Sequence, residues 1–241
     1  MHASQYDSDV TTWSPQGRIF QIEYAMEAIK QGSACLALRS DTHCVIAAYK
    51  RLETQKKIYK IDNQIGCTLS GLNADARSLS TFMKEECMGY KFTNESPLPV
   101  SRLVGRVADK AQKRTMGNGP RPFGVGIILA GVDQTGPHIY QTDPSGRYDE
   151  YFATTMGAKS QGIKTYLERH FKSFSTCNVN ALVAHAILAL QASSQDAELG
   201  MENCSIAVVG IGEDLKEFTV DEIKERLATA KTFNSTTSTF N

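Results

Sequence analysis

The sequence of 241 residues predicts an α+β protein in which two antiparallel sheets pack face to face between outer layers of helix. Predicted elements come in blocks of four strands, two helices, three strands, two helices, two strands and one helix. This blocked order argues against the strict alternation of a parallel doubly wound sheet. The length suits one large domain, and no change of composition divides the chain. We therefore expect a single domain over residues 1–230, followed by a polar tail over residues 231–241.

The first predicted helix begins at Ser14-Pro15, where a hydroxyl can cap free N–H groups and proline suits the first turn. Gly32 marks its end. Between them, apolar residues recur at helical spacing, namely Ile19, Ile22, Met26 and Ile29. The pattern predicts a helix over residues 14–31 that is preceded by a tail over residues 1–13.

Short β-like runs and two helical segments follow. The predicted strands are Ala34–Leu38, Cys44–Tyr49, Lys57–Ile61 and Ile65–Ser70. The predicted helices are Asn73–Met88 and Val100–Thr115, with Pro97 and Pro99 between them. The Gly/Pro cluster Gly117–Pro122 ends this block.

The second half repeats the blocked pattern. Its predicted strands are Val125–Val132, His138–Thr142, Tyr148–Met156, Ser205–Gly210 and Glu217–Thr219. Its predicted helices are Ser160–Phe171, Val179–Ala192 and a last one that begins at the capping box Thr219 and Glu222. Ser, Thr and Asn dominate residues 231–241, so we expect disorder there.

Composition and charge exclude several classes of function. Lys+Arg and Asp+Glu both number 26, so the chain lacks the basic excess of a nucleic-acid or membrane-surface protein. Residues 1–10 lack the apolar stretch of a secretory signal, and Val125–Val132 is too short to span a bilayer. The six cysteines form no CxxC pair and the five histidines no HxxxH pair, which argues against a metal site. We expect a cytoplasmic and nuclear protein with no metal and no cofactor, and with neither nucleic acid nor membrane as a partner.

Motifs for phosphate binding and catalysis are incomplete. Gly66–Gly71 has the glycine spacing of a phosphate loop, but Leu72 occupies the position of the required lysine. Gly124-Val125-Gly126 lacks the third glycine of a dinucleotide fingerprint. No GxSxG motif is present, and no base is indicated beside Cys177. His185, in the middle of a predicted helix, fits a packed or surface histidine better than a ligand.

The most specific feature is the block from Tyr6 to Ala25. It combines Tyr-Asp, an aromatic-Ser-Pro triplet, Gly-Arg and Gln-Ile-Glu-Tyr-Ala in fixed register. This block resembles the signature of alpha-type subunits of the 20S proteasome. Further matches extend the resemblance to Thr219, namely Gln55–Ile58, Ser70–Leu72, Ala74–Arg77, Arg121–Gly126 and Tyr166–Arg169. Gln31–Ser33 and Leu98–Leu103 resemble the alpha type-1 subfamily, although residues 51–55 look short and the acidic tail of some members is missing.

The resemblance implies the N-terminal-nucleophile hydrolase-like fold of proteasome subunits, a four-layer αββα sandwich. It implies that the first helix lies across the top of a seven-membered ring and that residues 1–13 form a gate tail. The expected partners are six other alpha subunits, beta-ring subunits, the C-terminal tails of regulatory particles or activators, and unfolded protein substrates in transit. The implied function is a scaffold of protein degradation that gates substrate entry and docks regulators.

The peptidase subunits of this fold use an N-terminal threonine, whose amine is the base, with an aspartate and a lysine. The resemblance places Ser33, Tyr49 and Lys57 at these positions. Ser33 is internal and has no free amine, and Tyr49 cannot replace a carboxylate because its reference pKa is about 10. We therefore expect no catalytic residue. The alternatives are a peptidase that becomes active by processing at Ser33 and a stand-alone binding module.

Two groups of site residues also follow from the resemblance. Lys57, in the context Lys57-Ile58, is expected to line a pocket that receives the C-terminal tail of a regulator. An ammonium group that pairs with a terminal carboxylate forms a strong charge-assisted bond. Tyr6, Asp7, Pro15 and Tyr24 are expected to hold the N-terminal tail when the gate opens, through hydrogen bonds of two phenols and a carboxylate.

Overall fold

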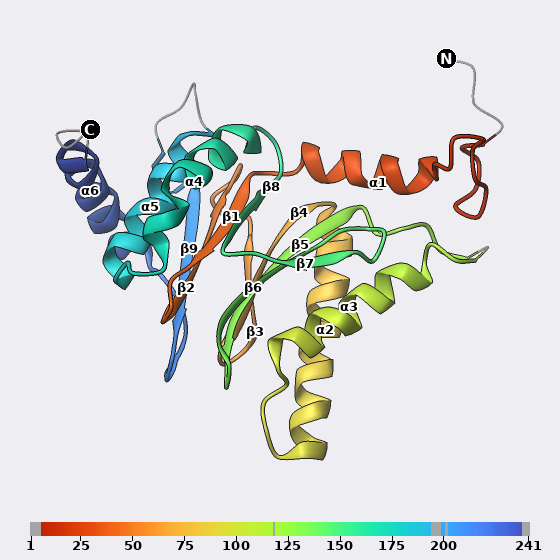
Figure 1. Ribbon diagram of the computed structural model, residues 1–241, viewed down its shortest axis with the longest axis horizontal. Coiled ribbons are helices and arrows are strands. Elements are labelled where there is room, and N and C mark those ends of the chain that lie inside the picture. Colours follow the sequence, from red (N-terminus) through yellow and green to blue (C-terminus); the bar gives the residue numbers. More distant parts are fainter. Residues whose placement is uncertain (1–5, 118, 194–198, 201, 238–241) are drawn as a thin grey trace.

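The computed structural model describes the whole chain except residues 1–5, 118, 194–198, 201 and 238–241. Its described part contains two five-stranded sheets in which every neighbouring pair of strands is antiparallel (Figure 1). The first sheet has the order β10-β9-β2-β1-β8, with bounds β1 Cys35–Arg39, β2 His43–Tyr49, β8 Ala153–Met156, β9 Cys204–Gly210 and β10 Glu213–Glu217. The second has the order β3-β4-β5-β6-β7, with bounds β3 Ile58–Asp62, β4 Ile65–Gly71, β5 Val125–Asp133, β6 Gly136–Thr142 and β7 Tyr148–Glu150.

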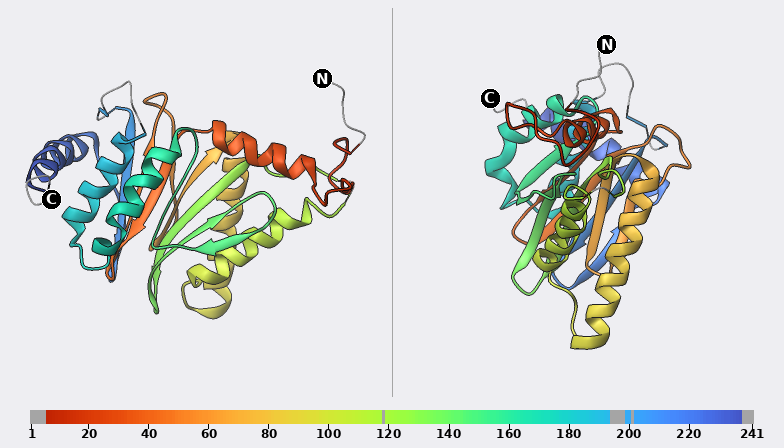
Figure 2. Two further views of the ribbon diagram at one scale, coloured as in Figure 1. Left: turned by 45° about the horizontal axis from the view of Figure 1, so that its top comes forward. Right: turned by 90° about the vertical axis from the view of Figure 1, so that its right-hand side faces the viewer.

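Six helices accompany these sheets in the described residues. Their bounds are α1 Phe20–Gln31, α2 Asn73–Asn94, α3 Val100–Lys113, α4 Ser160–Phe174, α5 Val179–Gln191 and α6 Val220–Thr237. Helices α4 and α5 cover the outer face of the first sheet, and α2 and α3 cover the outer face of the second (Figure 1). Helix α1 lies across one end of the second sheet, and the α2–α3 connection lies at the opposite end (Figure 2).

Three apolar clusters fill the spaces between the four layers. In β1, Leu36 and Leu38 face α4 and α5, whereas Cys35 and Ala37 face the second sheet. This alternation is the two-residue period of a strand, and both of its faces are buried here. A third cluster joins the second sheet to α2 and α3. The structure confirms the predicted four-layer sandwich of two antiparallel sheets.

One predicted strand, Tyr148–Met156, is wrong as a single element. Its first part is β7, which pairs with β6, and its second part is β8, which pairs with β1 in the other sheet. At the crossing, Tyr151 N donates to Ile139 O of the second sheet, and Phe152 O accepts from Arg39 N of the first. No glycine or proline separates β7 from β8, so the sequence pattern does not reveal the change of sheet.

The N-terminal helix begins at Phe20, not at residue 14. Ser14 forms a separate turn: its N–H donates to Arg18 O at 2.9 Å, and its Oγ accepts from Arg18 N at 3.1 Å. Gly17 within this turn has a φ of +75°, a left-handed conformation that glycine adopts without strain and that a helix cannot contain. The predicted helix cap at Ser14 is therefore wrong: its hydroxyl closes a turn that precedes the helix.

The C-terminal region departs from prediction in two places. Strand β10 overlaps the predicted Glu217–Thr219 only at Glu217, because Thr219 caps the helix instead of extending the strand. The capping box is confirmed, since Thr219 N donates to Glu222 Oε2 at 2.9 Å and Glu222 N donates to Thr219 Oγ1 at 3.4 Å. Helix α6 continues to Thr237 and so includes residues 231–237, where we expected disorder. Serine and threonine lower helix propensity only modestly, so their presence does not stop a helix already begun. Residues 238–241 lie outside the described residues.

Candidate functional site

The tail before α1 is fastened to the helix by side chains one turn apart. Tyr24 Oη donates to Asp7 Oδ2 at 3.1 Å, and Gln21 Nε2 donates to the backbone oxygen of Asp7. Gln21 and Tyr24 are three residues apart, so they lie on the same face of the helix. Partial desolvation and the hydrogen bond to Asp7 both raise the pKa of Tyr24 above its ordinary value. We call this contact the tail clamp.

The structure brings together two of the four predicted gating residues within one chain. Asp7 and Tyr24 form the tail clamp, and Tyr6, half-buried, directly precedes it. Pro15 lies in the exposed turn closed by Ser14 and Arg18, where it restricts the backbone ahead of α1. Tyr24 remains 52% exposed, so its other face is available to a neighbouring molecule.

The segment that joins α1 to β1 is held tightly. Ser33 is only 5% exposed, and its backbone oxygen accepts from Ser70 Oγ at 3.2 Å. The oxygen of Gly32 accepts from Ala158 N at 2.7 Å. A side chain on Gly32 would lie 2.2 Å from Ser70 Oγ, so only glycine fits at this close approach. The Gly32–Ser33 peptide bond is therefore enclosed by two neighbouring segments, the end of β4 and the segment that follows β8.

Lys57, next to β3, is buried, with an exposed fraction of 4%. Burial lowers the pKa of its ammonium group, and nearby Arg51 lowers it further. Among the described residues, no carboxylate lies within salt-bridge distance of Lys57. The neighbouring thiol of Cys35 is neutral at physiological pH because burial raises its pKa to about 12. A buried cation without an anion is costly, so this site favours the arrival of an anionic group.

Tyr49 does not approach this lysine. It packs against the cluster between the first sheet and its helices, whereas Cys35, beside Lys57, faces the second sheet. The three positions of the peptidase pattern therefore do not converge. Ser33 and Lys57 both lie close to β1, but Tyr49 points to the opposite face of the first sheet.

An ion pair that we did not predict, between the buried Asp75 and the exposed Arg121, connects two of the family motifs. Arg121 Nη1 and Nη2 donate to the two carboxylate oxygens of Asp75 at 2.7 and 3.1 Å, and Gly124 N donates to Asp75 Oδ2 at 2.9 Å. Burial alone would raise the pKa of Asp75, but the bonds from Arg121 and Gly124 outweigh it and lower that pKa. Asp75 and Arg121 belong to the family motifs Ala74–Arg77 and Arg121–Gly126, which the sequence shows. Their contact across 46 positions cannot be derived from either motif alone.

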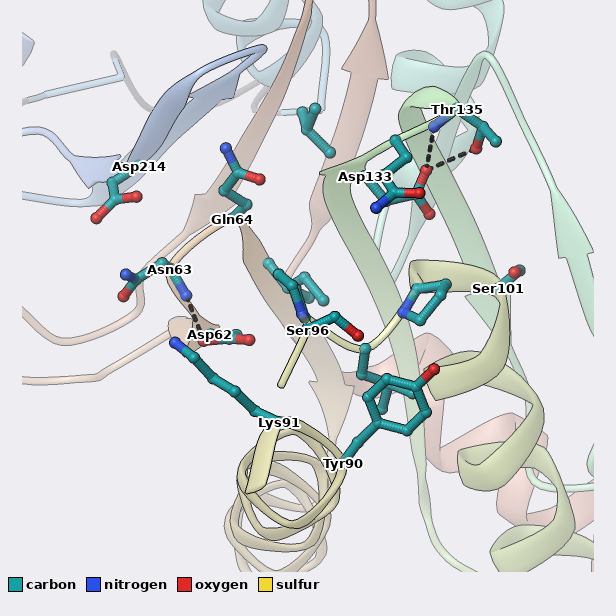
Figure 3. Close-up of a pocket in the computed structure, with 16 residues that line it drawn as sticks. Asp62, Asn63, Gln64, Tyr90, Lys91, Ser96, Ser101, Asp133, Thr135 and Asp214 are labelled. Atoms are coloured by element: carbon teal, nitrogen blue, oxygen red, sulfur yellow. Dashed lines mark hydrogen bonds between the residues drawn. The ribbon is translucent and has the colours of Figure 1, made fainter. Parts of the chain in front are cut away.

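A cavity of about 460 Å³ lies at the end of the molecule opposite α1, between the β3–β4 turn, α2 and the β5–β6 turn (Figure 3). Asp133 in its wall is already engaged, since it accepts from Thr135 N at 2.9 Å and from Val100 N at 3.1 Å. None of the predicted site residues lines this cavity. In the described part of the chain, no three His, Cys, Asp or Glu residues are grouped so that they could hold a metal ion. No helix of this part is long and apolar enough to cross a membrane.

The comparison with protein families matches two adjoining parts of the chain. Residues 6–28 match the N-terminal signature of A-type proteasome subunits, and residues 29–209 match the proteasome subunit family. The chain belongs to the proteasome alpha-subunit family. The boundary between the two matches falls within α1, so the tail clamp lies entirely in the alpha-specific part.

Several curated relatives of this alpha-family chain cover nearly its whole length. It is 48% identical over 223 residues to the alpha type-1 proteasome subunit of Dictyostelium discoideum, which covers 90% of each chain. It is 44% identical over 239 residues to the alpha type-1 proteasome subunit of Trypanosoma brucei rhodesiense, covering 96% of this chain and 90% of the relative. A probable alpha type-6 proteasome subunit of Schizosaccharomyces pombe is 46% identical over 233 residues, covering 94% of this chain and 86% of the relative. Membership of this family implies assembly with other proteasome subunits.

Proposed function

We propose that this chain is a non-catalytic subunit of the outer alpha ring of a 20S proteasome, at the ring position of the alpha type-1 subfamily. The observation that carries the proposal is the folded tail and α1 ahead of Ser33, which leave this residue internal and enclosed. In this role the chain joins six other alpha subunits, contacts a beta ring and acts in protein degradation in the cytoplasm and nucleus.

The geometry argues against a peptidase that becomes active at Ser33. An N-terminal nucleophile needs its own free amine as base, and here that nitrogen is part of the peptide bond to Gly32. Processing would have to cut a bond whose flanking oxygens are held by Ser70 and Ala158. Even after such a cut, no carboxylate stands at the position of Tyr49.

Two further roles belong to this proposal. The tail clamp supports a gating role, because it joins the tail to α1 through an exposed phenol that can also contact a neighbouring alpha subunit. Lys57 supports a docking role, because a buried ammonium without a carboxylate partner among the described residues favours the terminal carboxylate of a regulator tail. Unfolded substrates would pass through the ring without binding a dedicated site on this chain.

The test is to express the chain together with the other subunits and purify the resulting particle. We expect the chain to enter a large particle with its residues ahead of Ser33 intact by mass spectrometry. We also expect the purified chain alone to hydrolyse no peptide. Hydrolysis by the pure chain that disappears in Ser33→Ala would overturn the proposal.

A further inference from the structure

The two edges of the first sheet differ in how they are protected. One edge strand, β10, reads Glu-Asp-Leu-Lys-Glu, and its pairing with β9 shifts register between Glu213 and Lys216. Charged side chains and an irregular register are the usual devices that prevent an edge strand from pairing with another chain. The opposite edge strand, β8, reads Ala-Thr-Thr-Met, with neither a charged residue nor proline. Strand β8 is therefore open to pairing in a way that β10 is not.

The free backbone groups of β8 can be assigned from its pairing with β1. Arg39 and Phe152 lie opposite each other in the register that pairs Leu38 with Ala153, and Arg39 N donates to Phe152 O at 2.9 Å. In an antiparallel ladder, hydrogen-bonded and non-hydrogen-bonded positions alternate. The N–H and C=O groups of Ala153 and Thr155 consequently point away from β1. No hydrogen bond joins these four outward groups to any other residue that the structure describes.

A groove runs along this open edge, with a cavity volume of about 490 Å³. One wall is helix α4, which contributes Leu167 and Phe171 (Figure 1 shows α4 beside β8). The other wall comes from the second sheet and its connection, through Gln141 and Tyr151. Thr154 Oγ1 donates to Gln141 Oε1 and fixes the position of this second wall.

The groove has the form that an extended polypeptide requires. A strand beside β8 would alternate its side chains between α4 and the second sheet. Four residues, the length of β8, extend for about 13 Å at 3.3 Å per residue. Phe152 and Phe171 both line the groove and meet edge to face with ring centres 6.4 Å apart, and the guanidinium of Arg39 lies 4.4 Å from the centre of the Phe152 ring. Lys164 and Glu168 on the rim offset each other's charge, so the groove favours an apolar or uncharged segment.

We infer that an extended segment of a neighbouring proteasome subunit pairs with the β8 edge and fills this groove as a sixth strand of the first sheet. The inference rests on the proposed function, because the occupant follows from membership of a family whose chains assemble with one another. The contacts of the Phe152 ring form within this chain alone, so a partner need not create them, which suits a lasting subunit contact. Main-chain bonds to Ala153 and Thr155 would provide affinity, and the two walls would select the side chains.

The first test removes one outward donor. Thr155→Pro deletes the N–H that points into the groove, and an edge strand tolerates proline where that group faces away from the sheet. Thr155→Ala is the matched control, because it keeps the N–H and loses the same bond from Thr155 Oγ1 to Cys35 O. Incorporation into the particle should fall about tenfold for Thr155→Pro relative to Thr155→Ala, as the loss of one buried hydrogen bond predicts. Phe171→Glu, which places a charge in the groove on a residue 48% exposed, should weaken incorporation without changing the backbone.

The second test identifies the occupant directly. A photo-crosslinking amino acid at position 171 of the full chain, activated in the purified particle, should join it to a neighbouring proteasome subunit. If the wild-type chain enters the particle, but both variants enter equally well and no subunit is crosslinked, the inference is wrong while the proposed function stands. A crosslink to a regulator or to a substrate also overturns the inference. If the wild-type chain enters no particle, the proposed function itself fails.

Discussion

The side chain of Lys57 is the residue on which regulator docking depends most directly. Replacing it by alanine should weaken binding of a regulator's C-terminal tail peptide about tenfold or more, since a hydrogen bond between charged groups is lost. Lys56→Ala is the matched control, because Lys56 is exposed and lies over the ring of Tyr59. Titration of assembled particles with the six other tail pockets blocked measures the effect.

The depressed pKa of Lys57 adds a pH signature. Its ammonium loses its proton at a lower pH than an exposed lysine does, so tail binding should weaken as pH rises toward the reference value of about 10.4. Equal affinities for wild type and Lys57→Ala would remove this residue from the docking role.

His185 gives the fold a dependence on acid. Burial beneath α4 lowers its pKa to about 4, with His170 as the second cause, and its Nδ1 lies 3.0 Å from Tyr166 Oη. Between about pH 6.5 and 4 the unfolded chain binds a proton that the folded chain does not, so stability falls as pH falls through this window. We expect a loss of roughly 2 kcal/mol from this group in urea unfolding at the acid end of the window, compared with pH 7. His185→Phe, packed against Phe174, should reduce that loss; an unchanged pH dependence would assign it to other groups.

The sequence identified the site residues better than it predicted what surrounds them. The resemblance selected Asp7 and Tyr24, and the structure joins them. The burial of Lys57 was not predictable, since lysine is almost always solvated and one neighbour of this lysine, Cys35, is distant in the chain. The bidentate pair of Asp75 and Arg121 was missed for a related reason, because its partners are distant in the chain.

Gating should require the tail clamp, which joins the N-terminal tail to α1. Tyr24→Phe removes only the hydroxyl that donates to Asp7, so the particle should assemble normally but respond less to an activator. Tyr148→Phe, which alters another exposed tyrosine, is the control. Peptide hydrolysis by particles with and without activator measures this. If Tyr24→Phe and Asp7→Asn particles are activated as fully as the control, the clamp is only structural.

Single elements were predictable where periodicity is local. The capping box at Thr219 appears as the sequence specifies, because it needs only residues three apart. The crossing between β7 and β8 was missed because no glycine or proline marks the point where the partner strand changes. The start of α1 was misplaced because a hydroxyl followed by proline opens turns as well as helices, and Gly17 decides between them.

The architecture of the whole molecule was predictable because blocks of strands can pair with their neighbours only in antiparallel fashion. The order of strands within the first sheet was not predictable, because β8 and β9 come late in the chain and pair with β1 and β2, which come early. In the same topology Ser33 lies between α1 and β1, so it is not an N-terminal residue. This is why we infer a scaffold subunit rather than a peptidase.

The most direct measurement is a high-resolution image of the native particle, isolated through this chain. We expect the chain to occupy one place in an outer ring of seven, with α1 on the outer face and the Gly32–Ser33 peptide bond intact. Finding the chain in an inner ring with Ser33 as its first residue, or only as a free protein near 26.5 kDa, would contradict the account.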